Sequence, residues 1–97
     1  MAIRFTWDPK KAENNVRDHG IDFEVAKNVF NDPHLVILED LETDEELRYN
    51  AVGYAAANLF VVVTHVDLSD EQEEVIRLIS ARKGEAFEES IYADQFA

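Results

Sequence analysis

Three arginines in the second half of the sequence, Arg48, Arg77 and Arg82, have the chemistry to bind a phosphate group. A guanidinium presents its donors in a planar fork that fits two oxygens of a phosphate or of a carboxylate. Val75 and Ile79 flank Arg77 at i±2, so in a regular strand Arg77 shares a face with apolar residues and needs a partner. Each arginine is therefore a candidate phosphate ligand, with an ion pair to a carboxylate of the same chain as the alternative.

Other side chains could transfer protons or contact a nucleic acid. His19 precedes Gly20 at the expected end of a helix, where it could act as a general acid or base, or only interact with the helix dipole. Tyr92 could stack on a base, or pack its ring on a sheet and leave its hydroxyl in water. Lys11 and Lys83 could contact phosphates, although a solvated lysine is the ordinary interpretation of Lys11.

The spacing of Arg77 and Arg82 limits how they can cooperate. They are five residues apart, and an odd separation puts two side chains on opposite faces of a regular strand. Both can point into one pocket only if the strand twists or bulges between them.

Capping residues predict where the helices that position these groups begin and end. Asp8 is the expected N-cap of a first helix with Pro9 at its first position, and Gly20 is placed to end it. Asp22 is the expected N-cap of a second helix, whose apolar stripe runs to Phe30 before Pro33 ends it.

The rest of the chain is expected to form strands and one final helix. The strands are expected over residues 2–6, 35–38, 47–54, 58–66 and 74–82, and the helix over 85–94. The order β-α-α-β-β-β-β-α predicts an α+β fold, with helices packed on an antiparallel sheet. The runs 59–63 and 75–81 are expected to be neighbouring central strands, because the first is apolar on both faces. Trp7, between a strand and a capped helix, is expected to anchor the core.

Composition limits the class of protein. The chain has 97 residues, 46 % of them hydrophobic, which suits one domain spanning 1–97. It has no cysteine, which excludes disulfides and thiolate metal sites. No signal peptide is recognised, and the longest unbroken apolar stretch, 59–63, is far too short to cross a membrane. We therefore expect a soluble, cytoplasmic protein without a cofactor.

The net charge is −12, because nine Lys and Arg stand against twenty-one Asp and Glu. Such a field repels nucleic acid and attracts basic partners. Carboxylates gather in two expected turns, over 39–46 and 67–74, where a solvated charge cluster is the ordinary interpretation. A metal site is not expected there, because the Gly-bearing loop of an EF-hand is missing.

Three segments, taken in order, resemble the pattern of one toxin family. They are 5–12 continuing through Asn15, His19-Gly20, Phe23 and 29–33; then 46–49 followed by Gly53; and finally 76–83 followed by Tyr92. The pattern is similar to that of the BrnT-type toxins of bacterial type II toxin–antitoxin operons, and it covers nearly the whole chain.

The resemblance implies a RelE-like fold and a metal-independent endoribonuclease that acts without the ribosome. Cleavage of this kind needs a base for the ribose 2′-OH, cations around the phosphate and an acid for the leaving oxygen. The site residues that the resemblance implies are Arg48, Arg77, Arg82, His19 and Tyr92, with Lys11 and Lys83 contacting RNA. It also implies neutralisation by a small basic antitoxin with a ribbon-helix-helix or similar module, so that DNA is contacted only through the antitoxin.

The sequence departs from the family pattern in charge. Asp18 and Glu89 stand where relatives usually carry basic residues, and 65–67 is also less basic than usual. Weak RNA binding is therefore expected. The alternative to a nuclease is an acidic protein-binding module with weak or no catalysis, and a third interpretation is a decoy that mimics DNA.

Overall fold

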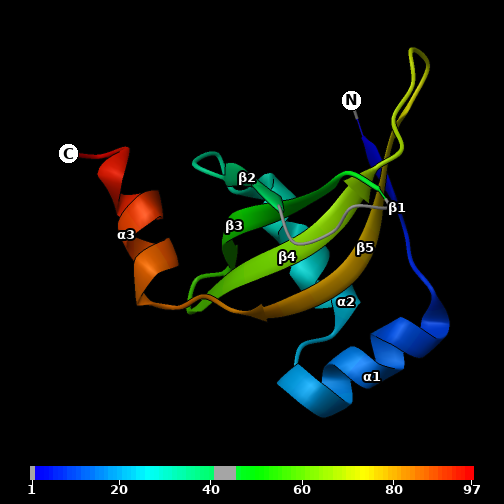
Figure 1. The fold of residues 1–97 in the computed structure, drawn as a ribbon, viewed down its shortest axis with the longest axis horizontal. Coiled ribbons are helices and arrows are strands. Elements are labelled where there is room, and N and C mark those ends of the chain that lie inside the picture. The colour runs from blue at the N-terminus through cyan, green and yellow to red at the C-terminus, as the bar shows by residue number, and fades with distance from the viewer. Residues whose placement is uncertain (1, 41–45) are drawn as a thin grey trace.

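The computed structural model describes residues 2–40 and 46–97. Its strands are β1 (Ile3–Thr6), β2 (Val36–Asp40), β3 (Arg48–Ala56), β4 (Leu59–Asp67) and β5 (Glu74–Lys83), and its helices are α1 (Pro9–His19), α2 (Phe23–Ala26), the 3₁₀ helix η1 (Lys27–Asn31) and α3 (Ala86–Asp94). A twisted sheet has α2 behind it, α1 along one side and α3 at the opposite side (Figure 1). The expected acidic turn at Glu42, Asp44 and Glu45 lies outside the described residues.

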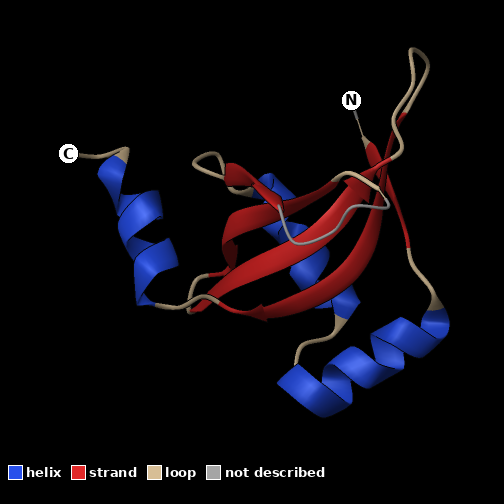
Figure 2. Ribbon diagram, viewed as in Figure 1, coloured by secondary structure: helices blue, strands red, loops and turns tan. Residues whose placement is uncertain are grey.

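The strands form one sheet in the order β1-β5-β4-β3-β2 (Figure 2). The antiparallel pairs from β2 to β5 confirm the expected α+β fold, the order of its elements and the neighbouring pair β4 and β5. β1 pairs parallel with β5, so the sheet is mixed and not wholly antiparallel. Ile3 faces Glu74 across this pair, and nothing local in the sequence specifies so distant a partner.

Both expected helix starts are confirmed. The side chain of Asp8 accepts a hydrogen bond from the backbone N–H of Lys10 at 2.8 Å, and that of Asp22 accepts one from Glu24 at 2.8 Å. α1 ends at Gly20, whose φ of 71° lies in the left-handed region that glycine adopts without strain. No helix in the described ranges has the length and apolar character needed to cross a membrane.

The second helix is shorter than expected. Its α-helical part ends at Ala26, and the chain continues as a 3₁₀ helix to Asn31. A 3₁₀ helix has about three residues per turn, so Ala26 and Val29 lie on one side, and both are fully buried. Val25, which a regular helix would add to the apolar stripe, is 40 % exposed.

The core fills the space between the helices α2 and η1 and one face of the sheet. Its buried residues are Ile21, Phe23, Ala26, Val29, Ala51, Ala55, Val61, Val63, Ile76, Leu78 and Ala81. Trp7 packs against this cluster and meets Phe23 edge to face, with 5.7 Å between ring centroids. The expected role of Trp7 as a core anchor is therefore confirmed.

A buried polar side chain fastens α1 to β5. Asn15 is only 4 % exposed. Its amide nitrogen donates to the carbonyls of Ile21 and Ala81 at 2.9 Å, and its amide oxygen accepts from the N–H of Ala81 at 3.0 Å. Asn15 thereby satisfies both backbone groups of Ala81, as a neighbouring strand would. α1 takes this place because β1 pairs with β5 only as far as Arg77.

An irregularity in β5 decides which side chains share a face. The register against β4 shifts between Leu78 and Ser80, so Ile79 is the extra residue of a bulge. Arg77 alternates with the core residue Leu78, and after the bulge Arg82 returns to the side of Arg77. A bulge between Arg77 and Arg82 was one of the two ways in which both could share a face, and it is the one that the structure shows.

Candidate active site

A cleft opens where the start of α1 meets β3 and β5. Its volume is about 260 Å³, and its lining residues are Asp8, Lys11, Glu46, Arg48, Arg77, Leu78 and Ile79. We call it the arginine cleft. It brings together three predicted cations, Lys11, Arg48 and Arg77, with two carboxylates. The cleft is thus locally positive by formal charge in a chain whose net charge is −12.

Strand pairing explains why Arg48 and Arg77 meet. Arg77 faces Val66 of β4, and Arg48 precedes the cross-strand pair of Tyr49 and His65, which puts it level with Val66 on the other side. Two strand spacings, about 10 Å in all, therefore separate the two backbones. Arginine side chains are long enough to reach a common partner across this distance.

Glu46 is that common partner. Arg77 Nη2 donates to Oε1 and Oε2 of Glu46 at 3.0 and 2.9 Å. Arg48 donates from Nε and Nη2 to Oε1 at 3.4 and 3.3 Å. The exposed fractions of the side chains are 36 % for Glu46, 29 % for Arg48 and 38 % for Arg77, so the network stays open to solvent. The ion-pair alternative considered for both arginines is therefore present, inside a cleft.

The ion pairs leave part of each guanidinium unused. Within the described part of the chain, Arg77 makes no hydrogen bond through Nε or Nη1, and Arg48 makes none through Nη1. Lys11 is exposed and has no hydrogen bond or ion pair to residues 2–40 or 46–97. Asp8, in contrast, caps α1. Donors of three cations are thus available to an incoming anion.

Arg82 lies on the same face as Arg77 and has a different partner. Its Nη1 and Nη2 donate to Oε1 and Oε2 of Glu88 at 2.9 and 2.6 Å, a bidentate pair. Glu88 is 3 % exposed and also accepts from the N–H of Glu85 at 2.8 Å, in a capping box that begins α3. The bond to Arg82 is the main reason why the pKa of Glu88 is lowered. The pair fastens α3 to β5, and a role of Arg82 in catalysis stays a prediction.

Tyr92 belongs to an aromatic group beside α3 and does not line the arginine cleft. Its ring meets Tyr54 and Phe60 edge to face, and its hydroxyl donates to Oδ2 of Asp32 at 2.8 Å. Asp32 also accepts from the backbone N–H groups of His34 and Tyr54. Burial alone would raise the pKa of Asp32, but these hydrogen bonds outweigh it and lower that pKa. The hydroxyl of Tyr92 thus has a partner within the protein and is not left to water.

Gly53, which belongs to the family pattern, makes room for this arrangement. A Cβ at Gly53 would lie 2.8 Å from Oδ2 of Asp32 and 3.4 Å from Val29. Any larger residue would force the carboxylate of Asp32 to move and would disturb the hydrogen bonds that converge on it.

Titration of the tyrosines tests the link between Tyr92 and Asp32. Burial and the bond to Asp32 raise the pKa of Tyr92 to about 12. One of the three tyrosines should therefore ionise near pH 12 in the folded protein, whereas an ordinary tyrosine ionises near pH ~10. Folding favours the neutral form, so this stabilisation is full below about pH 10 and is lost as the pH rises towards 12.

Ultraviolet absorbance at alkaline pH measures this step. Tyr92→Phe should remove the late ionisation, and Tyr49→Phe should leave it in place. A wild-type titration without a late step would contradict the assignment.

His19 and Lys83 also lie outside the arginine cleft. Lys11 reaches the cleft from the start of α1, while Asn15, one turn later, bonds to Ala81. His19 is therefore about 12 Å along the helix from Lys11. Both His19 and Lys83 are exposed, and their expected roles stay predictions.

The acidic departures from the family pattern are placed outside the cleft as well. Asp18 pairs with the adjacent Arg17 at 3.2 Å near the end of α1. Glu89 is exposed on α3 beside the aromatic group. Their negative charge is thus not part of the arginine cleft.

Sequence reasoning missed Glu46 as a member of the site. The expectation for 39–46 treats Glu46 as one more solvated carboxylate in a turn. However, Glu46 is two residues before Arg48, and this spacing puts both side chains on one side of an extended chain. That spacing, together with its place in the 46–49 segment, is the signal that could have identified it.

Comparisons with known proteins agree on one family. A family model described as the ribonuclease toxin BrnT of type II toxin–antitoxin systems matches residues 7–88. The crystal structure of the Brucella abortus ribonuclease toxin BrnT shares the fold with a TM-score of 0.63 and 20 % sequence identity, over 87 % of this chain and 99 % of that chain. No protein with curated function matches. The matched region contains every residue that lines the arginine cleft.

Proposed function

The chain belongs to the BrnT family of ribonuclease toxins of type II toxin–antitoxin systems, and from this we propose that it cleaves RNA in the arginine cleft. We further propose that the reaction needs no metal, that it takes place in the cytoplasm, and that a small basic antitoxin neutralises it. The single observation that carries the proposal is the convergence of Lys11, Arg48 and Arg77 on one cleft around the carboxylate of Glu46.

In the proposed reaction the chain's own residues supply a base and an anion site. The carboxylate of Glu46 takes the proton of the ribose 2′-OH, whose oxygen attacks the adjacent phosphorus. Asp8 is not assigned this role, because its side chain caps α1. Arg48 and Arg77 hold the phosphate oxygens through donors that the ion pairs leave unused, and they stabilise the charge that develops there.

The leaving group requires a proton. The bond from phosphorus to the 5′-oxygen breaks, and the products are a 2′,3′-cyclic phosphate end and a 5′-hydroxyl end. Arginine does not release its protons in proteins. We therefore assign proton donation to the ammonium of Lys11, which lines the same cleft.

The charge of the chain supports the proposed antitoxin. A net charge of −12 attracts a basic protein, and association should be fast at low salt and slower as salt screens the field. The same charge repels RNA outside the cleft, so cleavage should be weak and should be best at low salt.

Incubation of the purified, antitoxin-free chain with RNA tests the nuclease. We expect cleavage at low salt that EDTA does not inhibit, with 2′,3′-cyclic phosphate ends identified by mass spectrometry. Arg77→Ala should lower the rate about a hundredfold, since a donor to the developing charge is lost. It should also reduce the salt slope of RNA binding by about one unit.

Arg4→Ala is the matched control, because Arg4 pairs with Glu73 at 2.9 Å on the exposed surface, away from the cleft. Loss of activity in both variants would point to a general effect of charge. RNA that stays intact at low salt would contradict the nuclease and favour the second candidate, an acidic protein-binding module, to which the net charge of −12 points.

A further inference from the structure

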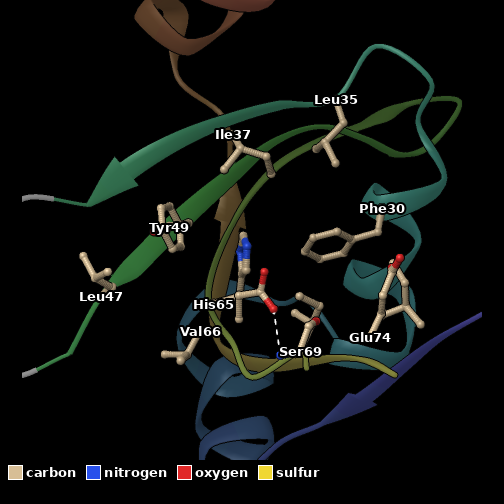
Figure 3. A pocket seen from close by; sticks show the side chains of 12 residues that line it. Phe30, Leu35, Ile37, Leu47, Tyr49, His65, Val66, Ser69 and Glu74 are labelled. Atoms are coloured by element: carbon tan, nitrogen blue, oxygen red, sulfur yellow. Dashed lines mark hydrogen bonds between the residues drawn. The ribbon is translucent and has the colours of Figure 1, made fainter. Parts of the chain in front are cut away.

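A second and larger depression lies at the same end of β3 and β5 as the arginine cleft, but on the opposite face of the sheet, the side of the core. Its volume is about 780 Å³. Figure 3 shows Phe30, Leu35, Ile37 and Tyr49 around it, with His65 between them. Its other apolar lining residues are Ile3, Leu47, Val66 and Ile76. We call it the apolar hollow, and none of its lining residues belongs to the arginine cleft.

The floor of the apolar hollow carries one polar atom without a partner. His65 is 3 % exposed, and its ring packs edge to face on Phe30 at 5.0 Å between centroids. Its Nδ1 lies 3.0 Å from the carbonyl of Val63, which can only accept, so Nδ1 carries the proton. Nε2 bonds to no described residue. Every fully buried side-chain nitrogen or oxygen among the described residues has a hydrogen-bond partner, so Nε2 is not fully buried. Nε2 therefore opens into the hollow as an acceptor.

This acceptor is maintained at neutral pH. Burial lowers the pKa of His65, and it outweighs the opposite effects of the bond to Val63 and the charge of Asp67. The ring is therefore neutral at pH 7, and Nε2 keeps its lone pair. A ligand that fits the floor has to offer a hydrogen-bond donor.

The rim of the hollow is acidic. Asp67 and Glu74 line it, and Glu39 lies beside it, facing Tyr49 across strands β2 and β3. Bonds from Ser69 lower the pKa of Asp67, so this rim residue stays ionised. Among residues 2–40 and 46–97, no lysine or arginine lines the hollow. This charge repels the phosphates of RNA and attracts cations.

Access to the hollow is open from the side of β2. β2 is an edge strand, and Ile37 and Leu47 at the rim are 47 % and 62 % exposed. Isolated exposed apolar residues are common, but here they border an apolar depression with an unpartnered acceptor at its floor.

From these features we infer that the apolar hollow is where the basic antitoxin docks. A large apolar side chain of the antitoxin fills the space between Phe30, Ile37 and Ile76, a donor meets Nε2 of His65, and basic neighbours lie over Asp67 and Glu74. The inference rests on the antitoxin of the proposed function and adds its docking surface. Apolar anchors surrounded by complementary charge are typical of sites that dominate binding energy at interfaces.

The probe for the test is the purified product of the reading frame adjacent to this gene. Its Kd for the full chain is measured with Ile37→Lys, whose partly exposed position should tolerate the change. Val16→Lys is the matched control, because Val16 is 48 % exposed on α1, outside the hollow. We expect Ile37→Lys to weaken binding at least about thirtyfold and Val16→Lys to change it less than about twofold.

A second pair of variants tests the rim. Glu74→Lys should slow association about tenfold more than Glu13→Lys, an equal change of charge on the exposed surface of α1. Circular dichroism and the melting temperature show that each variant is folded. If Ile37→Lys misfolds, Glu74→Lys decides.

The outcomes are distinguishable. Equal Kd values for the hollow and control variants would overturn the docking surface and leave the proposed antitoxin standing. No binding by the unaltered chain would contradict both. If Ile37→Lys alters the KM for RNA cleavage and leaves the antitoxin Kd unchanged, the hollow holds an RNA base instead, and the inference is wrong.

Discussion

Glu46→Gln should lower the rate of RNA cleavage about a thousandfold while RNA binding is kept or strengthened. A general base contributes roughly 10²- to 10⁴-fold to a rate. Glutamine keeps the size and the hydrogen-bond acceptor of the carboxylate but cannot take a proton. It also removes a negative charge beside Arg48 and Arg77, which favours the binding of a phosphate. Single-turnover cleavage of a fluorescent RNA gives the rate, and anisotropy gives the Kd.

Glu73→Gln is the matched control, because Glu73 also pairs with an arginine but lies on the exposed surface. It should leave both rate and Kd unchanged. The opposite result for Glu46→Gln, faster cleavage, would show that Glu46 blocks the phosphate site in place of acting as its base. Loss of RNA binding together with the rate would instead mean that Glu46 only holds the arginines in place.

Arg82→Ala should cost about 2–3 kcal/mol of unfolding free energy at pH 7. It leaves the carboxylate of Glu88, 3 % exposed, without its bidentate partner. Removing one member of a buried pair costs roughly 3–5 kcal/mol of unfolding free energy. The cost is smaller here because the side chain of Arg82 is 37 % exposed and solvent screens its charge. For a chain of this length the melting temperature should fall by about 10–20 °C. Calorimetry and urea unfolding measure the change.

The pH dependence identifies the cause. Arg82 lowers the pKa of Glu88 below the ordinary glutamate value of 4.5. The stabilisation is therefore complete above that pH and is lost as the pH falls through the lowered pKa. The difference between wild type and Arg82→Ala should therefore shrink in acid. Arg4→Ala, which breaks an exposed pair, should leave the unfolding free energy almost unchanged. An Arg82→Ala protein of unchanged stability would contradict the role of this pair.

This result also bears on catalysis by Arg82. A loss of cleavage by Arg82→Ala would indicate a catalytic role of Arg82 only if it is measured at a temperature where the variant is folded. Stability is therefore measured before activity.

Most of the fold could be predicted from local signals in the sequence. Asp8, Asp22 and Gly20 are residues whose side chain or backbone preference fixes a helix end, and each occurs where expected. Turn and apolar patterns predicted where the four later strands lie. Their pairing followed, because successive antiparallel strands usually pair with their neighbours in sequence. The parallel pairing of β1 and the 3₁₀ geometry of η1 were not predicted, since both depend on tertiary packing.

Of the candidate site, only the grouping of some residues could be expected from the sequence, for a similar reason. Residue types and the family pattern selected Arg48 and Arg77, and strand register then brought them together. The same pattern selected Arg82 and Tyr92, whose partners Glu88 and Asp32 lie beyond the reach of a sequence argument that treats one strand or helix at a time. A one-residue bulge, invisible in composition, changed which arginines share a face.

The amide of Asn15 has a consequence for how the molecule behaves at high concentration. An unpaired stretch of strand is a template on which another chain can add, and this is a common start of aggregation. Beyond the end of β1, the backbone groups of Ala81 in β5 would form such a template. Because Asn15 already bonds to both of them, the second half of β5 cannot recruit a strand there. A single side chain on a helix thus helps to keep a valine-rich sheet from growing into a fibre.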